Sequence, residues 1–171
     1  MPCAPLAPEF ATALADCDGI FSSTGFKVST LAVHLAVLLA LADRRWLSRR
    51  GGFLAFMRDP TKRGGFSAGA VARLTLGCNF VGVACARSLH FQFRVWYANA
   101  VPLLLASTQL PWAANAALLV AIEAAWNPWG VSETSSVASS VLLTGAHLVV
   151  LAGLFLGPDA GEPEDRGKKR R

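Results

Sequence analysis

Three long runs of the sequence, at 28–42, 95–122 and 134–157, contain no Asp, Glu, Lys or Arg. As helices, runs near 20 apolar residues match the hydrocarbon thickness of a bilayer, about 30 Å. Apolar residues fill these runs continuously rather than as amphipathic stripes, and only 16% of the chain is charged, against about 25% in an average soluble domain. The sequence therefore predicts an all-α fold, a polytopic transmembrane helix bundle with about four to five membrane segments.

Charged and turn-forming residues mark where the apolar segments end. We expect a bundle at 21–157, with apolar segments at 26–42, 68–86, 96–110, Trp112–Trp126 and Val137–Leu156. All five tryptophans fall at or just beyond segment ends, as expected for indole rings that prefer the membrane interface. The stretch 1–20 lacks the basic region of a secretory signal. We expect it to be a disordered or non-native start, and the charged tail 158–171 to be disordered as well.

Charge also predicts the topology. The loop 43–65 carries seven Lys or Arg against two acids and is expected in the cytoplasm. If 96–126 formed one long helix, the C-terminus would lie in the lumen. A helical hairpin broken at Pro111 would instead return the C-terminus to the cytoplasm, beside the basic loop, and we favour it. Each arm spans only about 22 Å, so a re-entrant pair with the same topology stays open.

The C-terminal tail contains two lysines at a defined spacing. Lys168 and Lys169 occupy positions −4 and −3 from the C-terminus. A cytosolic dilysine at that spacing is a receptor-read retrieval signal of the endoplasmic reticulum, whereas the alternative is a generic basic tail attracted to anionic lipid. The register favours retrieval, and predicts a multi-pass protein of the endoplasmic reticulum membrane with a cytosolic C-terminus.

The stretch 87–97 combines cationic, amide and aromatic side chains at the predicted lumenal surface. Arginine suits phosphate because its planar fork donates two hydrogen bonds at once, while Trp and Tyr suit sugar faces and lipid interfaces. The alternative is an ordinary interfacial belt with snorkelling arginines. The candidate ligand-binding residues are Arg87, His90, Gln92, Trp96 and Tyr97.

Several polar residues lie inside the apolar segments. Glu123 lies about one turn from the end of its segment, and because intramembrane carboxylates are costly, we expect it to pair with an arginine. Arg73 and Asn79 are the candidate partners. His34 and His147 are expected to be neutral histidines that hydrogen-bond across helices.

The sequence lacks several kinds of site. It contains no nucleotide-binding loop, hydrolase motif or clustered His/Asp metal spacing, so we expect no metal and no cofactor. Cys78 and Cys85 are seven residues apart, which excludes a disulfide within one regular helix, and they are interpreted as packing residues. Basic residues flank apolar runs instead of alternating with aromatics, which argues against nucleic acid as a partner and for membrane lipid.

A long ordered motif begins at Asn79. It reads N-F-V-G-V at 79–83, A-R-S-L-H-F-Q-F at 86–93 and V-W-Y at 95–97. It resembles the pattern S-N-F-I-G-[IV]-x-F-[SA]-R-S-L-H-Y-Q-F-Y-x-W-Y of the dolichyl-phosphate-mannose-dependent alpha-1,3-mannosyltransferases of asparagine-linked glycosylation. Other matches follow in order over about 20–158: the run with His34, R-D-P-T-K-R at 58–63, the set Glu123, Trp126 and Asn127, and L-G-P at 156–158.

The resemblance implies a lipid-donor (GT-C type) glycosyltransferase of the endoplasmic reticulum. Its donor would be dolichyl-phosphate mannose and its acceptor the five-mannose lipid-linked oligosaccharide, joined by an alpha-1,3 bond in the lumen. The implied mechanism is inverting displacement with a carboxylate base. Arg87, His90 and Gln92 would contact the donor phosphate or the acceptor sugar, with Trp96 and Tyr97 at the lipid rim.

The chain departs from the family in length and in some residues of the motif. Family members are more than twice as long, and only their C-terminal part is matched. Their proposed base, in the first lumenal loop, has no counterpart here, so the catalytic residue is unknown and we expect a fragment that is inactive alone. Phe91 and Arg94 replace family tyrosines. The alternative function is a non-catalytic membrane scaffold or assembly subunit.

Overall fold

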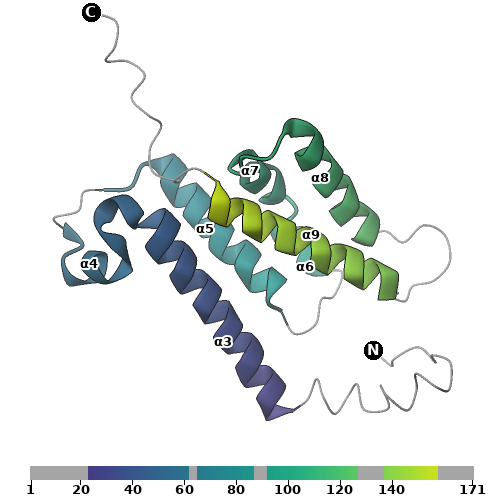
Figure 1. Cartoon of the computed structure of the whole chain (residues 1–171), viewed down its shortest axis with the longest axis horizontal. Helices are drawn as coiled ribbons and strands as arrows, with labels where there is room; N and C mark the ends of the chain where they lie inside the picture. Colours follow the sequence, from purple (N-terminus) through teal and green to yellow (C-terminus); the bar gives the residue numbers. More distant parts are fainter. Residues whose placement is uncertain (1–22, 62–64, 87–91, 127–136, 158–171) are drawn as a thin grey trace, which may run out of the picture.

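The computed structural model describes residues 23–61, 65–86, 92–126 and 137–157. Within these ranges every regular element is a helix, as the sequence predicts, and no strand occurs. The expected disordered ends and the link between the last two segments lie outside the described residues. Helices α5 to α9 gather into a bundle, and the long helix α3 lies along one side of it (Figure 1).

Serine caps begin the first two long helices. Helix α3 spans Thr24–Leu41, and the Ser23 side chain accepts a hydrogen bond from the Phe26 amide at 3.2 Å. Helix α5 spans Ala68–Ala84, and Ser67 accepts from the Ala70 amide at 3.2 Å. A serine in this position satisfies an amide that has no partner within the helix. The predicted segments 26–42 and 68–86 therefore form, displaced by about two residues at their ends.

The basic loop 43–65 was expected to be irregular but contains helical structure. A π-helical turn, η1 (Ala42–Trp46), continues α3, and a 3₁₀ turn, η2 (Ser48–Arg50), leads into α4 (Gly52–Arg58). Asp43 accepts a hydrogen bond from the Phe53 amide at 2.9 Å, and the Arg50 guanidinium lies 3.9 Å from the centre of the Phe66 ring. The Asp43 contact holds α4 against η1, which directly continues α3.

The predicted segment 96–110 is wrong as one helix. Helix α6 ends at Tyr97 (Gln92–Tyr97), and α7 begins after a turn, at Val101 (Val101–Ala106). Pro102 is the physical reason, because proline has no amide hydrogen and its ring collides with the carbonyl four residues earlier in a continuous helix. In the first turn of α7, where amides lack helical partners anyway, the proline is tolerated.

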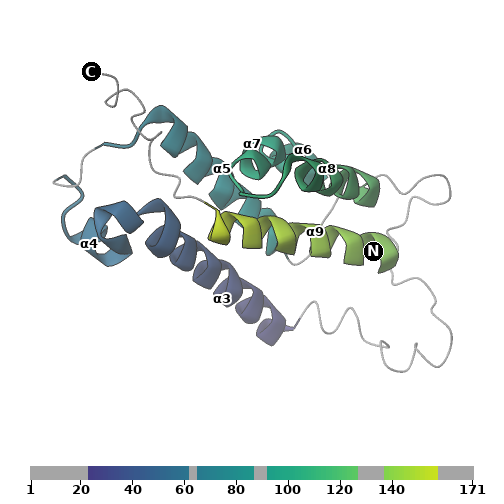
Figure 2. The same ribbon diagram turned by 45° about the horizontal axis from the view of Figure 1, so that its top comes forward.

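The last two helices have the predicted bounds, α8 at Trp112–Trp126 and α9 at Val137–Leu156. Trp126, at the end of α8, hydrogen-bonds Tyr97, which precedes α7. The chain therefore runs out along α7 and returns along α8, and the hairpin prediction is confirmed against the single long helix. Figure 2 shows α9 alongside this hairpin.

Burial is uneven across the helices. The core contains Phe80 and Val81 of α5, Leu104 of α7 and Val150 of α9, each at most 1% exposed. In contrast, α3 exposes most of its apolar side chains and buries only Leu41. Two stretches, Thr24–Trp46 and Val137–Leu156, are long and apolar enough to cross a membrane, while α5 and α8 are apolar but shorter.

Gly153 of α9 lies so close to Thr108 that one added methyl group is expected to destabilise the fold. A Cβ at Gly153 in α9 would lie 2.8 Å from Thr108 Cγ2, and Thr108 is held by its hydrogen bond to the Leu105 carbonyl. Gly153→Ala should therefore lower the free energy of unfolding by about 1–3 kcal/mol. Gly145→Ala in the same helix meets nothing within 4 Å and should be neutral or slightly stabilising. Equal thermal unfolding of the two variants in detergent would contradict this packing.

Candidate functional site

One end of the bundle brings together the polar residues of α5, α6, α8 and α9. The first contact there is an ion pair between helices, in which Arg94 of α6 donates to the carboxylate of Glu123 of α8. The arginine pairing expected for Glu123 is confirmed, but the partner is Arg94, and neither candidate partner occupies that position. Arg73 instead lines a hollow with residues of η1, α7 and α9.

The second contact lies one turn further along both helices. The Trp126 indole N–H donates to the Tyr97 hydroxyl oxygen at 2.6 Å, and the same oxygen lies 2.9 Å from Nε2 of His147 in α9. Indole is only a donor, so the tyrosine oxygen accepts from it and is free to donate its own hydrogen to Nε2. That arrangement requires a neutral His147 with its proton on Nδ1. The cross-helix role predicted for this histidine is confirmed.

Aromatic rings surround this hydrogen-bonded group. The Phe80 ring meets the rings of Tyr97 and His147 edge to face, with centroids 5.8 Å and 5.2 Å apart. Tyr97 is 1% exposed and His147 is 3% exposed. The expectation that Tyr97 lies at the lipid rim is therefore wrong for its ring, which is part of the core. Its hydroxyl is used to join α6, α8 and α9.

A third contact fixes α6 to α5. The Asn79 side chain donates to the backbone carbonyl of Trp96 at 2.8 Å. The Trp96 ring itself is 60% exposed and packs against Phe93, with centroids 4.9 Å apart. Asn79 therefore binds the backbone of α6, while the Trp96 side chain stays largely exposed, and its place at the lipid rim stays a prediction.

The remaining predicted residues are described only in part. Arg87, His90, Lys168 and Lys169 lie outside the described residues, and Gln92 starts α6 without a described side chain. His34 of α3 lies against Gly82 of α5, where an added Cβ would be 3.8 Å from its ring. Among the described residues, no three His, Cys, Asp or Glu side chains gather closely enough to hold a metal ion.

Sequence reasoning missed the partner of Glu123, although a signal was present. Arg94 and Tyr97 are three residues apart, as are Glu123 and Trp126. Residues at that spacing lie on one helix face. Two helices that pair Tyr97 with Trp126 therefore also bring Arg94 to Glu123.

Comparison with known proteins decides the family. The family model described as "ALG3 protein" matches residues 17–136. The chain belongs to this family. The resemblance drawn from the motif at 79–97 is therefore confirmed, and Arg94, which replaces a tyrosine of that motif, provides the ion pair to Glu123.

Three of the similar proteins share the name Dol-P-Man:Man(5)GlcNAc(2)-PP-Dol alpha-1,3-mannosyltransferase. The chain is 34% identical to the Arabidopsis thaliana protein over 157 residues (82% of this chain, 35% of the relative). It is 33% identical to the Mus musculus protein over 150 residues (84% and 33%) and 32% identical to the Homo sapiens protein over 148 residues (82% and 33%). The chain thus spans about a third of their length, in their C-terminal part. No solved structure matches.

Proposed function

We propose that this chain acts in the transfer of mannose from dolichyl-phosphate mannose to the five-mannose dolichyl-linked oligosaccharide, forming an alpha-1,3 bond. Its family and the names of its relatives support this reaction. The alternative, a non-catalytic scaffold, has no specific observation in its favour. The catalytic base is unassigned among the residues of this chain.

The anchoring of α6 supports a ligand-binding role for the residues around it. Three side-chain contacts hold this six-residue helix: Asn79 to its backbone, Glu123 to Arg94, and Trp126 with His147 to Tyr97. A binding site needs such support, because side chains that contact a ligand must be held in position by the residues behind them. We propose that Arg87, His90 and Gln92 contact the donor phosphate or acceptor sugar, that Trp96 offers its open face to the lipid, and that Tyr97 positions α6.

We further propose that the helices cross the endoplasmic reticulum membrane several times. The beginning of α5, the α7–α8 turn and the end of α9 then lie on the cytoplasmic side with the basic loop, while α6 lies at the lumenal side. The positive-inside rule supports this orientation. The tail with Lys168 and Lys169 follows α9 and would act as a cytosolic retrieval signal.

Arg87→Ala tests the function. The mouse relative, with its matched segment replaced by this chain, should restore mannose transfer in cells that lack the enzyme. Removing a guanidinium from a phosphate should then lower kcat/KM by about 100-fold at normal protein abundance. Arg44→Ala, in the basic loop, is the matched control and should leave kcat/KM unchanged. A loss of abundance without a loss of specific activity would show that Arg87 is structural.

A further inference from the structure

Helix α4 follows directly after the first stretch that is long and apolar enough to cross a membrane. That stretch ends at Trp46, and only residues 47–51 separate it from Gly52, where α4 begins. Figures 1 and 2 both show α4 outside the helix bundle, beside the end of α3. Where the stretch that ends at Trp46 leaves a membrane, α4 therefore lies within a few residues of the membrane surface.

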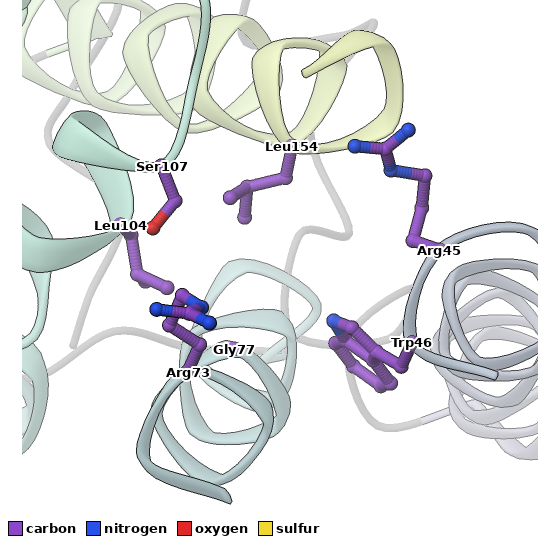
Figure 3. Close-up of a pocket in the computed structure, with 7 residues that line it drawn as sticks. All are labelled: Arg45, Trp46, Arg73, Gly77, Leu104, Ser107 and Leu154. Atoms are coloured by element: carbon purple, nitrogen blue, oxygen red, sulfur yellow. The ribbon is translucent and has the colours of Figure 1, made fainter. Parts of the chain in front are cut away.

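Two contacts keep the beginning of α4 close to the end of that stretch. An added Cβ at Gly77 of α5 would lie 3.0 Å from the Trp46 ring, so the indole rests directly on α5, as Figure 3 shows. Asp43 accepts a hydrogen bond from the Phe53 amide at 2.9 Å and so joins α4 to η1. Indole rings prefer the membrane interface. The packing of Trp46 therefore indicates the level at which α4 begins.

The two faces of α4 differ in what they contact. Phe53 and Phe56 are half-buried, and the Phe56 ring meets the Phe66 ring edge to face, with centroids 5.8 Å apart. In contrast, Leu54 is 70% exposed and Met57 is 61% exposed. Because residues three apart share a helix face, one face of α4 packs on protein. The other face presents two large apolar side chains to the surroundings.

Positive charge accompanies the exposed apolar face. Arg58 is exposed and lies four residues after Leu54, which places it on the same side of the helix. The loop 43–65 around it carries seven Lys or Arg against two acids. A lipid leaflet offers acyl chains to apolar side chains and anionic headgroups to cations, and helices that lie in the interface use both. The combination therefore favours lipid as what covers this face.

We propose that α4 lies in the plane of the membrane surface as an interfacial helix. Leu54 and Met57 enter the acyl chains, and Arg58 lies at the phosphate groups of anionic lipids. The helix then anchors the basic loop to the leaflet, in addition to the helices that cross it. This inference rests on the membrane placement in the proposed function, but it does not depend on mannose transfer.

Nitroxide labels on the 171-residue chain test this placement. The chain, with its four cysteines replaced by alanine, is reconstituted in nanodiscs of phosphatidylcholine and phosphatidylserine. Labels at Leu54→Cys and Met57→Cys should relax more strongly with oxygen, which concentrates among acyl chains, than with a water-soluble nickel chelate. Thr61→Cys, at an exposed polar position just after α4, is the matched control and should show the reverse. Val141→Cys, 66% exposed on α9, reports whether the chain crosses the membrane.

The labels distinguish the failure of this inference from the failure of the membrane placement. If the Val141 label lies in lipid while the Met57 label is as accessible to nickel as the Thr61 label, α4 is not interfacial and the inference is wrong. Nickel access at Val141 as well would overturn the membrane placement and the inference together. Shielding of Met57 from both reagents would mean that a protein surface covers this face, and would overturn lipid as its partner.

Arg58→Gln tests the contribution of charge. In nanodiscs with phosphatidylserine, it should shift the Met57 label toward the water-accessible population about fivefold, the contribution of one cation near an anionic surface. Arg58→Lys preserves the charge and should keep the wild-type ratio. In phosphatidylcholine alone, the effect of Arg58→Gln should be much smaller. An equal shift in both lipids would overturn the placement of Arg58 at anionic headgroups.

Discussion

Tyr97→Ala is expected to lower the free energy of unfolding by about 3–5 kcal/mol, the cost of deleting a large buried aromatic ring. Tyr97 is 1% exposed and joins three helices through one oxygen. Its removal opens a cavity beside Phe80 and leaves both the Trp126 N–H and the His147 ring nitrogen without this partner. The measurement is thermal or denaturant unfolding of the chain in detergent.

Tyr97→Phe separates the ring from its hydroxyl. The ring contacts with Phe80 are kept, while the buried His147 nitrogen and the part-buried Trp126 N–H lose the hydroxyl they share, at about 1–3 kcal/mol. His147→Phe removes one of those groups. In a protein that carries His147→Phe, the further change Tyr97→Phe should therefore lower the free energy of unfolding by less than it does in the wild type. Phe56→Leu, in the basic loop away from this cluster, serves as a control for ring loss elsewhere. A Tyr97→Ala variant that unfolds like wild type would contradict the central role of the cluster.

The helices that could be predicted to the residue are those whose ends carry a local signal. Pro111 precedes α8, and tryptophans lie at both of its ends. The run that forms α9 contains no charged residue. The prediction of one helix at 96–110 was wrong because Pro102 lies inside a continuous apolar run. Hydrophobicity alone does not show that this residue lacks an amide hydrogen. Helix α4 was missed because its seven residues are stabilised by a contact with Asp43, ten residues before Phe53, rather than by a hydrophobic pattern of their own.

The sequence predicted which stretch and which kinds of side chain form the candidate site, but not how each side chain is buried or paired. The chemistry of 87–97 and the family motif selected α6, in which Trp96 is exposed. The burial of Tyr97 could not be predicted from the neighbouring sequence, because it depends on how α6 packs against α8 and α9. The same packing pairs Arg94 with Glu123. The packing of α6 against α8 therefore determines both the burial of Tyr97 and the partner of Glu123.

Glu123→Gln should lower stability by about 2–3 kcal/mol in lipid nanodiscs, because it leaves the Arg94 guanidinium without this counterion at the helix contact. The two side chains are 30% and 41% exposed. A pair open to water would contribute only about 0–1 kcal/mol, so the larger value applies where those faces meet hydrocarbon. Measuring unfolding in nanodiscs therefore also tests the proposed membrane placement of this end of the bundle.

A double-mutant cycle isolates the ion pair from other effects of each change. Arg94→Gln alone removes this cation from the Glu123 carboxylate and should also be destabilising, whereas Arg94→Gln with Glu123→Gln removes both charges and leaves two amides able to hydrogen-bond each other. The double variant should thus be more stable than either single variant, a coupling that close partners show and distant residues do not. Arg44→Gln with Glu123→Gln, which combines a residue of the distant basic loop with the same acid, should show simple additivity. Additive losses for Arg94 and Glu123 as well would mean that the two charges do not stabilise one another, and that α6 is held by the Tyr97 and Asn79 contacts alone.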